Sequence, residues 1–550
     1  MDTKMKVCEM GETSRNSMTT IDSIGDDLLT NILNKLPALH FASASCVNHS
    51  WHRLCDSILS TPKLASALSL NPSIQDAVDE VFNKVFAEPI RPHFAIVAIG
   101  QSFEMNVALR LITKKLGTAI PIICTAAFGL MGRDVATNSF KEIPQWGEEV
   151  KEDYFDNWQF IDPGAFLDAD YAEILNYHKT NRNAAVLLTV GFLPGMKVAA
   201  VTLSKSKKDA LFIDEFVTNI RECSALASGC TSPAAIMLFA GLGTDTDGLL
   251  EKLDCAMSPE TAIIGDGSSV FICGGTCIQK NSKNSVAAVA LLFMRDRDKP
   301  NVQGNIQFHV ALSTGMSPIG PKYKAVSVRE IRGKGTTWLT AKRVGDIQEL
   351  DGETVLNQIY EEMPGLLKYP SLYLGVVKRR KCFLGSNEVK WITSQVFHEV
   401  HGGDEAQLFV EGRGIKTGDP FRVFQSDTHV ALSSLKNVSD KFRSLKQGSS
   451  GVGSSCLTSA SGNNNIIFGG IIFACIGRED GFLGKNDVDS TPFLENFPGV
   501  PLAGLYCGNS EICRSDSSLY DQELGSYCCF AHSYSSVYFV MSYTPSGPRI

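Results

Sequence analysis

Two aspartates in a glycine-rich segment are the first residues whose spacing could support chemistry. Asp245 and Asp247 lie within residues 241–248, GLGTDTDG, between an apolar run and an amphipathic one. Phosphates bind the backbone N–H groups at a helix start, and hard cations bind carboxylates. However, the segment has neither the dinucleotide nor the P-loop spacing and no Lys follows it, while two carboxylates are too few for a cation. We interpret it as a tight turn with Asp caps, and predict no metal and no cofactor.

A thiol and a guanidinium form the second candidate. Cys475 precedes Arg478 by three residues, and a nearby cation lowers the pKa of a thiol and activates it. The alternative that we favour is a buried thiol, because Cys475 ends the apolar run 466–475. Cys273 and Cys277 lack a second ligand pair, so zinc is not expected. The chain contains no H-E-x-x-H or G-x-S-x-G motif, and we predict no catalytic residues.

A dense basic run, KRRK, occupies residues 378–381. Such a run is typical of a nuclear import signal or an anion-binding patch. Because apolar segments 372–377 and 382–384 flank it, we favour a solvated hairpin turn. The net charge of −8 argues against nucleic acid as a partner.

The composition is that of a globular protein from a reducing compartment. The 550 residues are 44% hydrophobic and 20% charged, as in folded domains. The 16 Cys show no disulfide framework, which indicates the cytoplasm or the nucleus. The apolar runs are too short to cross a membrane, and the first residues lack the apolar core of a secretion signal.

Residues 21–64 are predicted to form three short helices. Asp22 or Ser23 can cap the first helix, and Pro37 ends it. Its apolar stripe consists of Leu28, Leu29, Ile32, Leu33 and Leu36. A second segment carries Phe41, Val47, Trp51 and Leu54, and a third covers 55–59. Three helices in so few residues bury too little surface to be stable alone, so the unit requires a partner.

These residues resemble an F-box. The resemblance rests on the paired aliphatic residues, on Leu36-Pro37, and on Val47 and Trp51. It departs from the family at Ile24-Gly25, where Leu-Pro is usual, and at His49, which replaces a basic residue. The resemblance implies docking on a Skp-type adaptor and, through it, on the cullin and RING subunits of an SCF ubiquitin ligase. The residues implied in that contact are Leu28, Leu29, Ile32, Leu33, Leu36, Pro37, Val47 and Trp51.

The sequence pattern of the remaining chain predicts a large α/β body. Strands and helices alternate from 93 to about 300, and strands dominate afterwards. We expect an α+β or mixed α/β protein with strand-rich, mixed sheets. The predicted parts are a disordered terminus (1–20), the three-helix unit (21–66), a helical linker (67–92), and halves at 93–365 and 366–543, with an insertion at 141–180 and a flexible loop at 444–465.

The two halves resemble the FIST N-terminal and C-terminal domains. The motifs are I-I-C-T-A at 122–126, G-M-S-P-I-G at 315–320 and Asp351-Gly352, then C-x-G-R at 475–478 and a last block with Pro501, Gly504, Tyr506, Glu511 and Ile512. The family implies a ligand-binding role for Cys475, Arg478, Tyr506 and Glu511. Ser510 stands where the family has Gly, which puts a ligand at that turn in doubt.

Together the resemblances imply a non-catalytic substrate receptor that bridges the adaptor and an unknown substrate protein. We expect the double substitution Leu33→Asp with Trp51→Ala to abolish adaptor binding. The alternative is a small-ligand sensor or enzyme in which the N-terminal helices are only structural. That alternative predicts saturable binding of a ligand by residues 93–543 alone.

Overall fold

The computed structural model describes residues 25–144, 184–204, 209–277, 286–299, 304–331, 335–363, 370–382, 390–446, 465–478, 480–485, 487–516 and 527–545. They form two compact units: a helical unit, residues 25–60 with 86–89, and a body formed by the rest. Three helices followed by mixed, strand-rich sheets confirm the predicted fold class. Residues 1–20, nearly all of the insertion and most of the loop at 444–465 lie outside the described residues.

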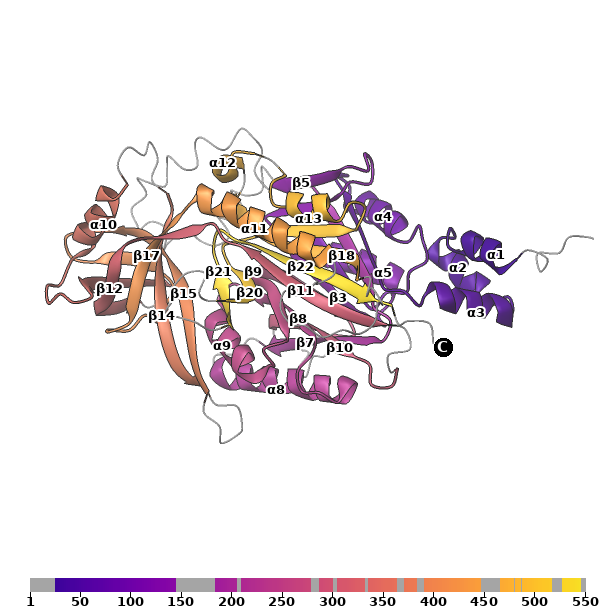
Figure 1. Cartoon of the computed structure of the whole chain (residues 1–550), viewed down its shortest axis with the longest axis horizontal. Helices are drawn as coiled ribbons and strands as arrows, with labels where there is room; N and C mark the ends of the chain where they lie inside the picture. The colour runs from indigo at the N-terminus through magenta and orange to yellow at the C-terminus, as the bar shows by residue number, and fades with distance from the viewer. Residues whose placement is uncertain are drawn as a thin grey trace, which may run out of the picture. The chain divides into compact units, whose positions relative to one another are not determined.

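The helical unit contains α1 (Asp26–Leu33), α2 (Ala38–Ala44) and α3 (His49–Ile58) (Figure 1). Gly25, rather than Asp22 or Ser23, is the N-cap of α1, and two aspartates occupy its first turn, where the helix dipole favours negative charge. Asn48 caps α3, because its Oδ1 accepts a hydrogen bond from the backbone N–H of Trp51 at 2.8 Å. The predicted division of the second and third helices was wrong: α3 continues through residue 55, and Val47 lies in the loop before it.

The larger sheet of the body has ten strands. Its order is β1-β6-β2-β3-β9-β8-β10-β7, and β20 joins it beside β9 with β21 on its other side. The strands are β1 (Lys63–Ser69), β2 (Phe94–Ile99), β3 (Pro121–Ala126), β6 (Val186–Phe192), β7 (Met196–Ser204), β8 (Ala235–Gly241), β9 (Ala262–Gly275), β10 (Val286–Arg295), β20 (Glu511–Asp516) and β21 (Tyr527–His532). Every residue of β2 and β6 is buried, as expected of continuous apolar strands covered on both faces. The sheet is mixed: β2–β3 and β8–β9 are parallel, and the other pairs are antiparallel.

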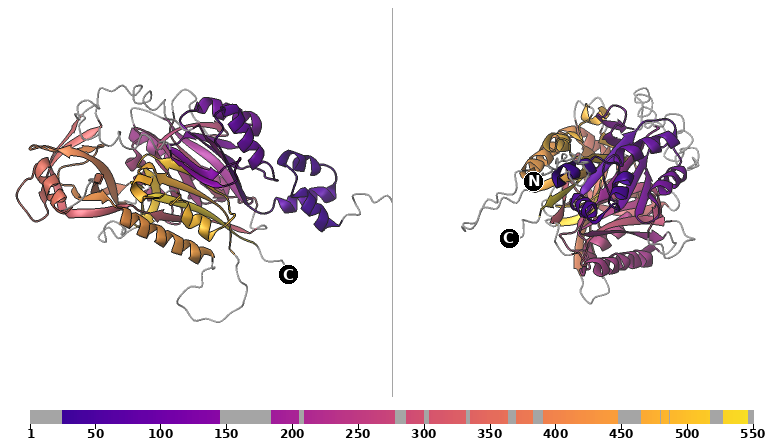
Figure 2. Two further views of the ribbon diagram at one scale, coloured as in Figure 1. Left: turned by 90° about the horizontal axis from the view of Figure 1, so that it is seen from above. Right: turned by 90° about the vertical axis from the view of Figure 1, so that its right-hand side faces the viewer.

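The smaller sheet has six strands in the order β11-β22-β18-β19-β4-β5. The strands are β4 (Gly129–Arg133), β5 (Phe140–Pro144), β11 (Asn305–Ser313), β18 (Ile466–Cys475), β19 (Leu502–Cys507) and β22 (Ser536–Thr544). The two sheets pack face to face around one apolar core (Figure 2). Phe239 and Phe293 of the larger sheet meet Phe473 and Phe539 of the smaller one, with ring centroids 5.9 and 6.0 Å apart.

Helices cover the outer face of each sheet, giving four layers. On the larger sheet, α4 (Ile74–Val85) packs against β1 and β6, α5 (Met105–Leu116) against β3 and β9, and α8 (Asp209–Ser228) against β7 and β10. The neighbouring α9 (Thr246–Ala256) buries three leucines in the same outer core as α8. On the smaller sheet lie α11 (Thr428–Lys446) and α13 (Thr491–Asn496).

A closed six-stranded barrel extends from the two sheets. Its strands follow the order β12-β13-β16-β15-β14-β17. They are β12 (Met316–Ile331), β13 (Thr336–Arg343), β14 (Leu372–Cys382), β15 (Lys390–Gly403), β16 (Leu408–Glu411) and β17 (Pro420–Ser426). The helix α10 (Gly352–Glu361) buries Val355, Leu356 and Ile359 in the barrel core.

Two of the predicted domain boundaries do not agree with the pairing of the strands. A boundary at 365/366 would divide the barrel, because β12 precedes it and pairs with β17, which follows it. The linker predicted at 67–92 is not wholly helical either. Its first residues belong to β1, which pairs with β6 over seven residues and forms part of the body.

Two local predictions were wrong, and one helix was not predicted. The spacing of Gly129 and Gly132 predicts a turn after the strand at 120–126, but these residues belong to the strand β4. The basic run 378–381 lies within β14 rather than in a hairpin turn. The helix α11 was missed, although Ala431, Leu435, Val438 and Phe442 have helical spacing and form its buried face. The intervening Ser and Val residues, which have low helix propensity, obscured that period.

Candidate functional site

The helical unit exposes four large aliphatic side chains. Leu28 and Ile32 lie one turn apart on α1 and are 62% and 47% exposed, Leu39 at the start of α2 is 77% exposed, and Val47 in the following loop is 60% exposed. Isolated exposed aliphatics are common, but Leu28 and Ile32 are neighbours on one side of α1, and adjoining exposed apolar side chains are a feature of interaction surfaces. We name Leu28, Ile32, Leu39 and Val47 the apolar surface.

The residues expected to bind the adaptor are divided by burial. Leu28, Ile32, Pro37 and Val47 are exposed. Leu29 and Leu33, with 4% and 0% exposure, instead form the core of the unit with Phe41, Ala44 and Cys55. Leu36 and Trp51 are partly buried against that core. Leu29 and Leu33 therefore hold the three helices together and position the exposed residues.

Leu39 was not among the predicted contact residues. Its position could have been found from the period of α2, because Phe41 and Ala44, three residues apart, define the buried face. A residue two positions before Phe41 lies on the opposite side of the helix. The Leu39 side chain therefore points away from the core of the unit.

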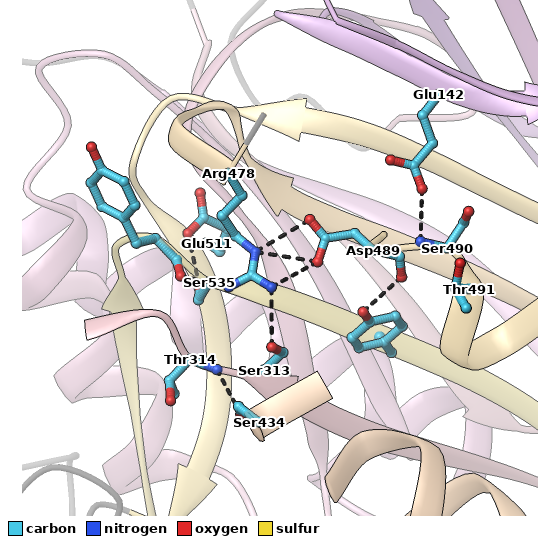
Figure 3. A network of polar contacts seen from close by, with 12 residues as sticks. Glu142, Ser313, Thr314, Ser434, Arg478, Asp489, Ser490, Thr491, Glu511 and Ser535 are labelled. Atoms are coloured by element: carbon cyan, nitrogen blue, oxygen red, sulfur yellow. Dashed lines mark hydrogen bonds and ion pairs between the residues drawn. The ribbon is translucent and has the colours of Figure 1, made fainter. Parts of the chain in front are cut away.

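A second candidate site lies in the body around Arg478, which is 1% exposed. The short helix η4 (Ile476–Arg478) follows β18 and places the guanidinium beside Asp489 and Ser313 (Figure 3). Arg478 Nε and Nη2 donate to the carboxylate of Asp489, Nη2 at 2.8 Å. Nη1 donates to the Tyr534 carbonyl and Nη2 also to Ser313 Oγ. Although burial disfavours the charged form, Asp489 raises the pKa of Arg478, and the donors of the guanidinium are directed at protein acceptors.

Cys475 and Glu511 are brought together where the two sheets meet. Cys475 Sγ donates to Asn509 Oδ1 at 2.6 Å, and Ser535 Oγ donates to Glu511 Oε2 at 2.8 Å. Burial raises the pKa of the Cys475 thiol well above its usual value. The thiol is therefore protonated at neutral pH, and Arg478 does not activate it. Burial likewise raises the pKa of Glu511 well above its usual value, which favours the protonated form of this carboxyl.

Tyr506 lies on the opposite face of the smaller sheet. It belongs to the outer core beneath α11 and α13, whereas its neighbour Cys507 belongs to the core between the sheets. The Tyr506 hydroxyl donates to Glu142 Oε2 at 2.8 Å. The four residues of the predicted ligand site therefore do not face one common space.

The described cavities are small. The largest of the three, lined by residues of α8, α9, β14 and β15, has a volume of about 170 Å³, and the other two hold about 10 Å³ each. Sites for small organic ligands are usually roughly 300–1,000 Å³. Cys475, Arg478, Tyr506 and Glu511 line none of these three cavities.

The glycine-rich segment is a capped turn, as predicted. Asp245 is the N-cap of α9, and its Oδ1 accepts a hydrogen bond from the backbone N–H of Gly248 at 3.0 Å. The described residues contain no cluster of His, Cys, Asp and Glu suited to a metal ion. Within the same ranges, no helix has both the length and the apolar character needed to cross a membrane.

Comparison with known proteins gives two domain matches and a full-length relative. An F-box domain matches residues 21–63, and a FIST N domain matches residues 93–333. An F-box/LRR-repeat protein of Arabidopsis thaliana is 37% identical over 546 residues, covering 97% of this chain and 96% of the relative. The described body consists of two sheets and a barrel, not the stacked strand–helix units of a leucine-rich repeat. The chain belongs to the F-box proteins and carries a FIST domain behind its F-box.

Proposed function

We propose that this protein is a substrate receptor of an SCF ubiquitin ligase. The helical unit would bind a Skp-type adaptor, which connects it to the cullin and RING subunits, and the body would hold a substrate protein for ubiquitination and proteasomal degradation. The observation that carries this proposal is the apolar surface, four large aliphatic side chains exposed on a unit that matches an F-box.

The energetics favour a partner over solvent at this surface. Fully burying an aliphatic side chain of this size contributes roughly 1.5–3 kcal/mol, and a few central apolar residues usually supply most of the binding energy of an interface. Leu28 and Ile32 project from the same side of α1, because residues four apart are neighbours on a helix. A complementary apolar groove on the adaptor would bury them together.

The body would act by positioning, without bond chemistry of its own. Holding a substrate beside the ubiquitin-charged enzyme replaces a diffusional encounter with a high effective concentration. The two packed sheets and the closed barrel provide a rigid scaffold for this purpose. We place this activity in the cytoplasm or the nucleus, in keeping with the absence of a disulfide framework among the 16 Cys.

A double substitution on α1 tests adaptor binding. In Leu28→Asp with Ile32→Lys, both apolar contacts are removed, while the new charges suit the first and last turns of the helix and form an i, i+4 pair. We expect the affinity for a purified Skp-type adaptor, measured by isothermal titration calorimetry, to fall by about 30-fold or more, corresponding to about 2 kcal/mol. The circular dichroism of the chain should not change.

The matched control introduces the same two charges in the body. Leu226→Lys with Ile347→Asp alters side chains that are 71% and 96% exposed and should leave adaptor affinity unchanged. Substitution of Leu33 is less informative, because its side chain is fully buried in the helical unit and Asp would unfold the unit. Wild-type adaptor affinity in the Leu28→Asp, Ile32→Lys variant would refute the proposed docking surface.

The same variant also identifies the substrate. Affinity purification followed by mass spectrometry should recover the adaptor, the cullin and the client with the wild-type chain. The α1 variant should lose the adaptor and the cullin and retain the client. Loss of the client together with the adaptor would contradict a separate substrate-binding body.

A further inference from the structure

The basic run of β14 is divided between two faces of the β14–β15 hairpin. Lys378 is 5% exposed, and Arg380 Nη1 lies 3.1 Å from Glu251 Oε2 on α9. From β15, Ser394 Oγ donates to the other oxygen of Glu251 at 3.0 Å. Asp247, at the start of α9, attracts the charge of Lys378. Lys378 and Arg380 thus lie on the same side of β14, where Lys378 is buried and Arg380 joins the hairpin to α9 through the Glu251 carboxylate.

The other two cations point outward beside a tryptophan. Arg379 and Lys381 are exposed, and the guanidinium carbon of the first and the ammonium nitrogen of the second each lie 5.0 Å from the ring centroid of Trp391. Lys381 pairs directly with Trp391 across the hairpin, and Arg379 pairs with Thr393. Trp391 remains 56% exposed. We name Arg379, Lys381 and Trp391 the hairpin patch.

The backbone beside the hairpin patch is that of a sheet edge. The pairing of β14 with β17 ends at Val376, whereas its pairing with β15 continues to Cys382. Beyond Val376, β15 is therefore the only described strand that pairs with β14. An extended peptide binds such an edge by adding a strand, and the neighbouring side chains supply specificity. In the orientation of Figure 1, the two strands extend downward past the rest of the barrel, towards α9.

We propose that the hairpin patch and the adjoining edge of β14 dock an acidic, extended segment of the substrate protein. Carboxylates of this segment would pair with Arg379 and Lys381, and Trp391 would provide an apolar platform. The charges favour an acidic peptide, because the patch is cationic on a chain of net charge −8. Two cations beside one ring are too few for nucleic acid, whose binding proteins depend on contacts with many phosphates. The inference rests on the proposed function, which requires a substrate-binding surface on the body.

The first test measures peptide binding by the full chain in complex with its adaptor. The probe is a fluorescein-labelled twelve-residue peptide of alternating Glu and Thr, followed by fluorescence anisotropy. We expect saturable binding that Arg379→Glu with Lys381→Glu weakens about tenfold or more, because two attractions become repulsions. Trp391→Ala leaves the charge unchanged and should also weaken binding, by about threefold or more, through loss of the platform.

The matched control places the same charge reversal elsewhere on the barrel. Lys324 on β12 and Lys416 before β17 are both exposed, and Lys324→Glu with Lys416→Glu should leave the affinity for the peptide unchanged. The corresponding Lys/Thr peptide should not bind. Equal weakening by both double variants, or no weakening by Arg379→Glu with Lys381→Glu, would overturn the proposal. Binding of a labelled twelve-nucleotide oligouridylate in preference to the acidic peptide would overturn it as well.

Adaptor affinity, measured on the same preparations, separates this inference from the proposed function. The hairpin variants should bind the adaptor as tightly as the wild-type chain does. A wild-type chain that binds the peptide without binding the adaptor would contradict the ligase role but support the patch. A chain that binds the adaptor without binding the peptide would support the ligase role and overturn the patch.

Discussion

At the scale of single residues, the body contains charges that are paired and buried. Arg478 and Asp489 are 1% exposed each, and the guanidinium also donates to Tyr534 and Ser313. Taking two charges out of water is unfavourable, so such a pair is stabilising only while it is intact. Arg478 thereby joins β18, β11 and the segment before α13, a structural role.

We expect Arg478→Met to destabilise the body by about 3–5 kcal/mol, because it leaves the Asp489 carboxylate buried without its partner. Urea-induced unfolding measures this loss. Adding Asp489→Leu to Arg478→Met should recover part of the loss, since no unpaired charge then remains. Arg443→Met, which breaks an exposed pair with Asp440, is the control and should change the stability by about 1 kcal/mol or less. An equal effect of the two single substitutions would contradict a structural role for the buried pair.

Glu142 should make the stability of the body depend on pH. Burial and the charge of Asp489 raise its pKa from an ordinary value of 4.5 to about 7, against the hydrogen bonds from Ser490 and Tyr506. Between these two values the folded state keeps a proton that the unfolded state releases, so stability falls as the pH rises through this window. Glu142→Gln removes this titration and can keep both hydrogen bonds, since the Tyr506 hydroxyl can accept from the new amide.

Relative to the wild-type chain, the Glu142→Gln variant should therefore gain about 2 kcal/mol of unfolding free energy between pH 5 and pH 8. Urea titrations at both pH values measure this difference, in which the other titrating groups cancel. A difference between variant and wild type that is the same at both pH values would show that the pKa of Glu142 is not raised.

At the scale of the elements, the sequence predicted the helices and strands whose apolar pattern is contained in one short segment of the chain. The sequence predicts a helix at 105–116 and apolar strands at 120–126, 234–240 and 466–475, and the bounds of α5, β3, β8 and β18 lie within a residue or two of these ranges. Pairing between distant segments escaped prediction, because no local pattern encodes it: β1 joins β6, and β12 joins β17. The candidate site on the helical unit was likewise predicted only in part. The apolar residues of α1 were found from their spacing, but which of them face inward depends on packing against α2 and α3.

One glycine in β9 shows how closely the strands of the larger sheet approach. Gly265 has φ +153°, and a Cβ atom there would lie 1.8 Å from the Leu238 carbonyl oxygen of β8, a paired backbone that cannot move without disrupting the sheet. Gly265→Ala should destabilise the body by more than about 2 kcal/mol. Gly481→Ala in α12 (Asp480–Leu483) meets nothing within 4 Å and is the control. Thermal unfolding of both variants measures the difference, and a Gly265→Ala variant as stable as the control would contradict the close approach.

At the scale of the whole molecule, the body starts before the matched FIST segment. The N domain match begins at residue 93, but β1 and α4 precede it and belong to the body. Leu64 and Leu68 of β1 are buried in the core between the two sheets, and α4 covers β1 and β6. The segment between the F-box and the FIST domain therefore contributes a strand and a covering helix to the body.

Two truncated chains test this boundary. Residues 61–550 retain β1 and α4 and should fold into a soluble monomer. Residues 93–550 lose the seven paired residues of β1, which leaves β6 as an open edge, and they lose α4, which leaves the outer face of β6 uncovered. Because an open apolar edge recruits strands from other molecules, we expect the shorter chain to aggregate. Size-exclusion chromatography and thermal melts distinguish the two, and a monomeric 93–550 chain that melts at the temperature of 61–550 would show that β1 is dispensable. A search for small ligands of the isolated body should use the longer chain for the same reason.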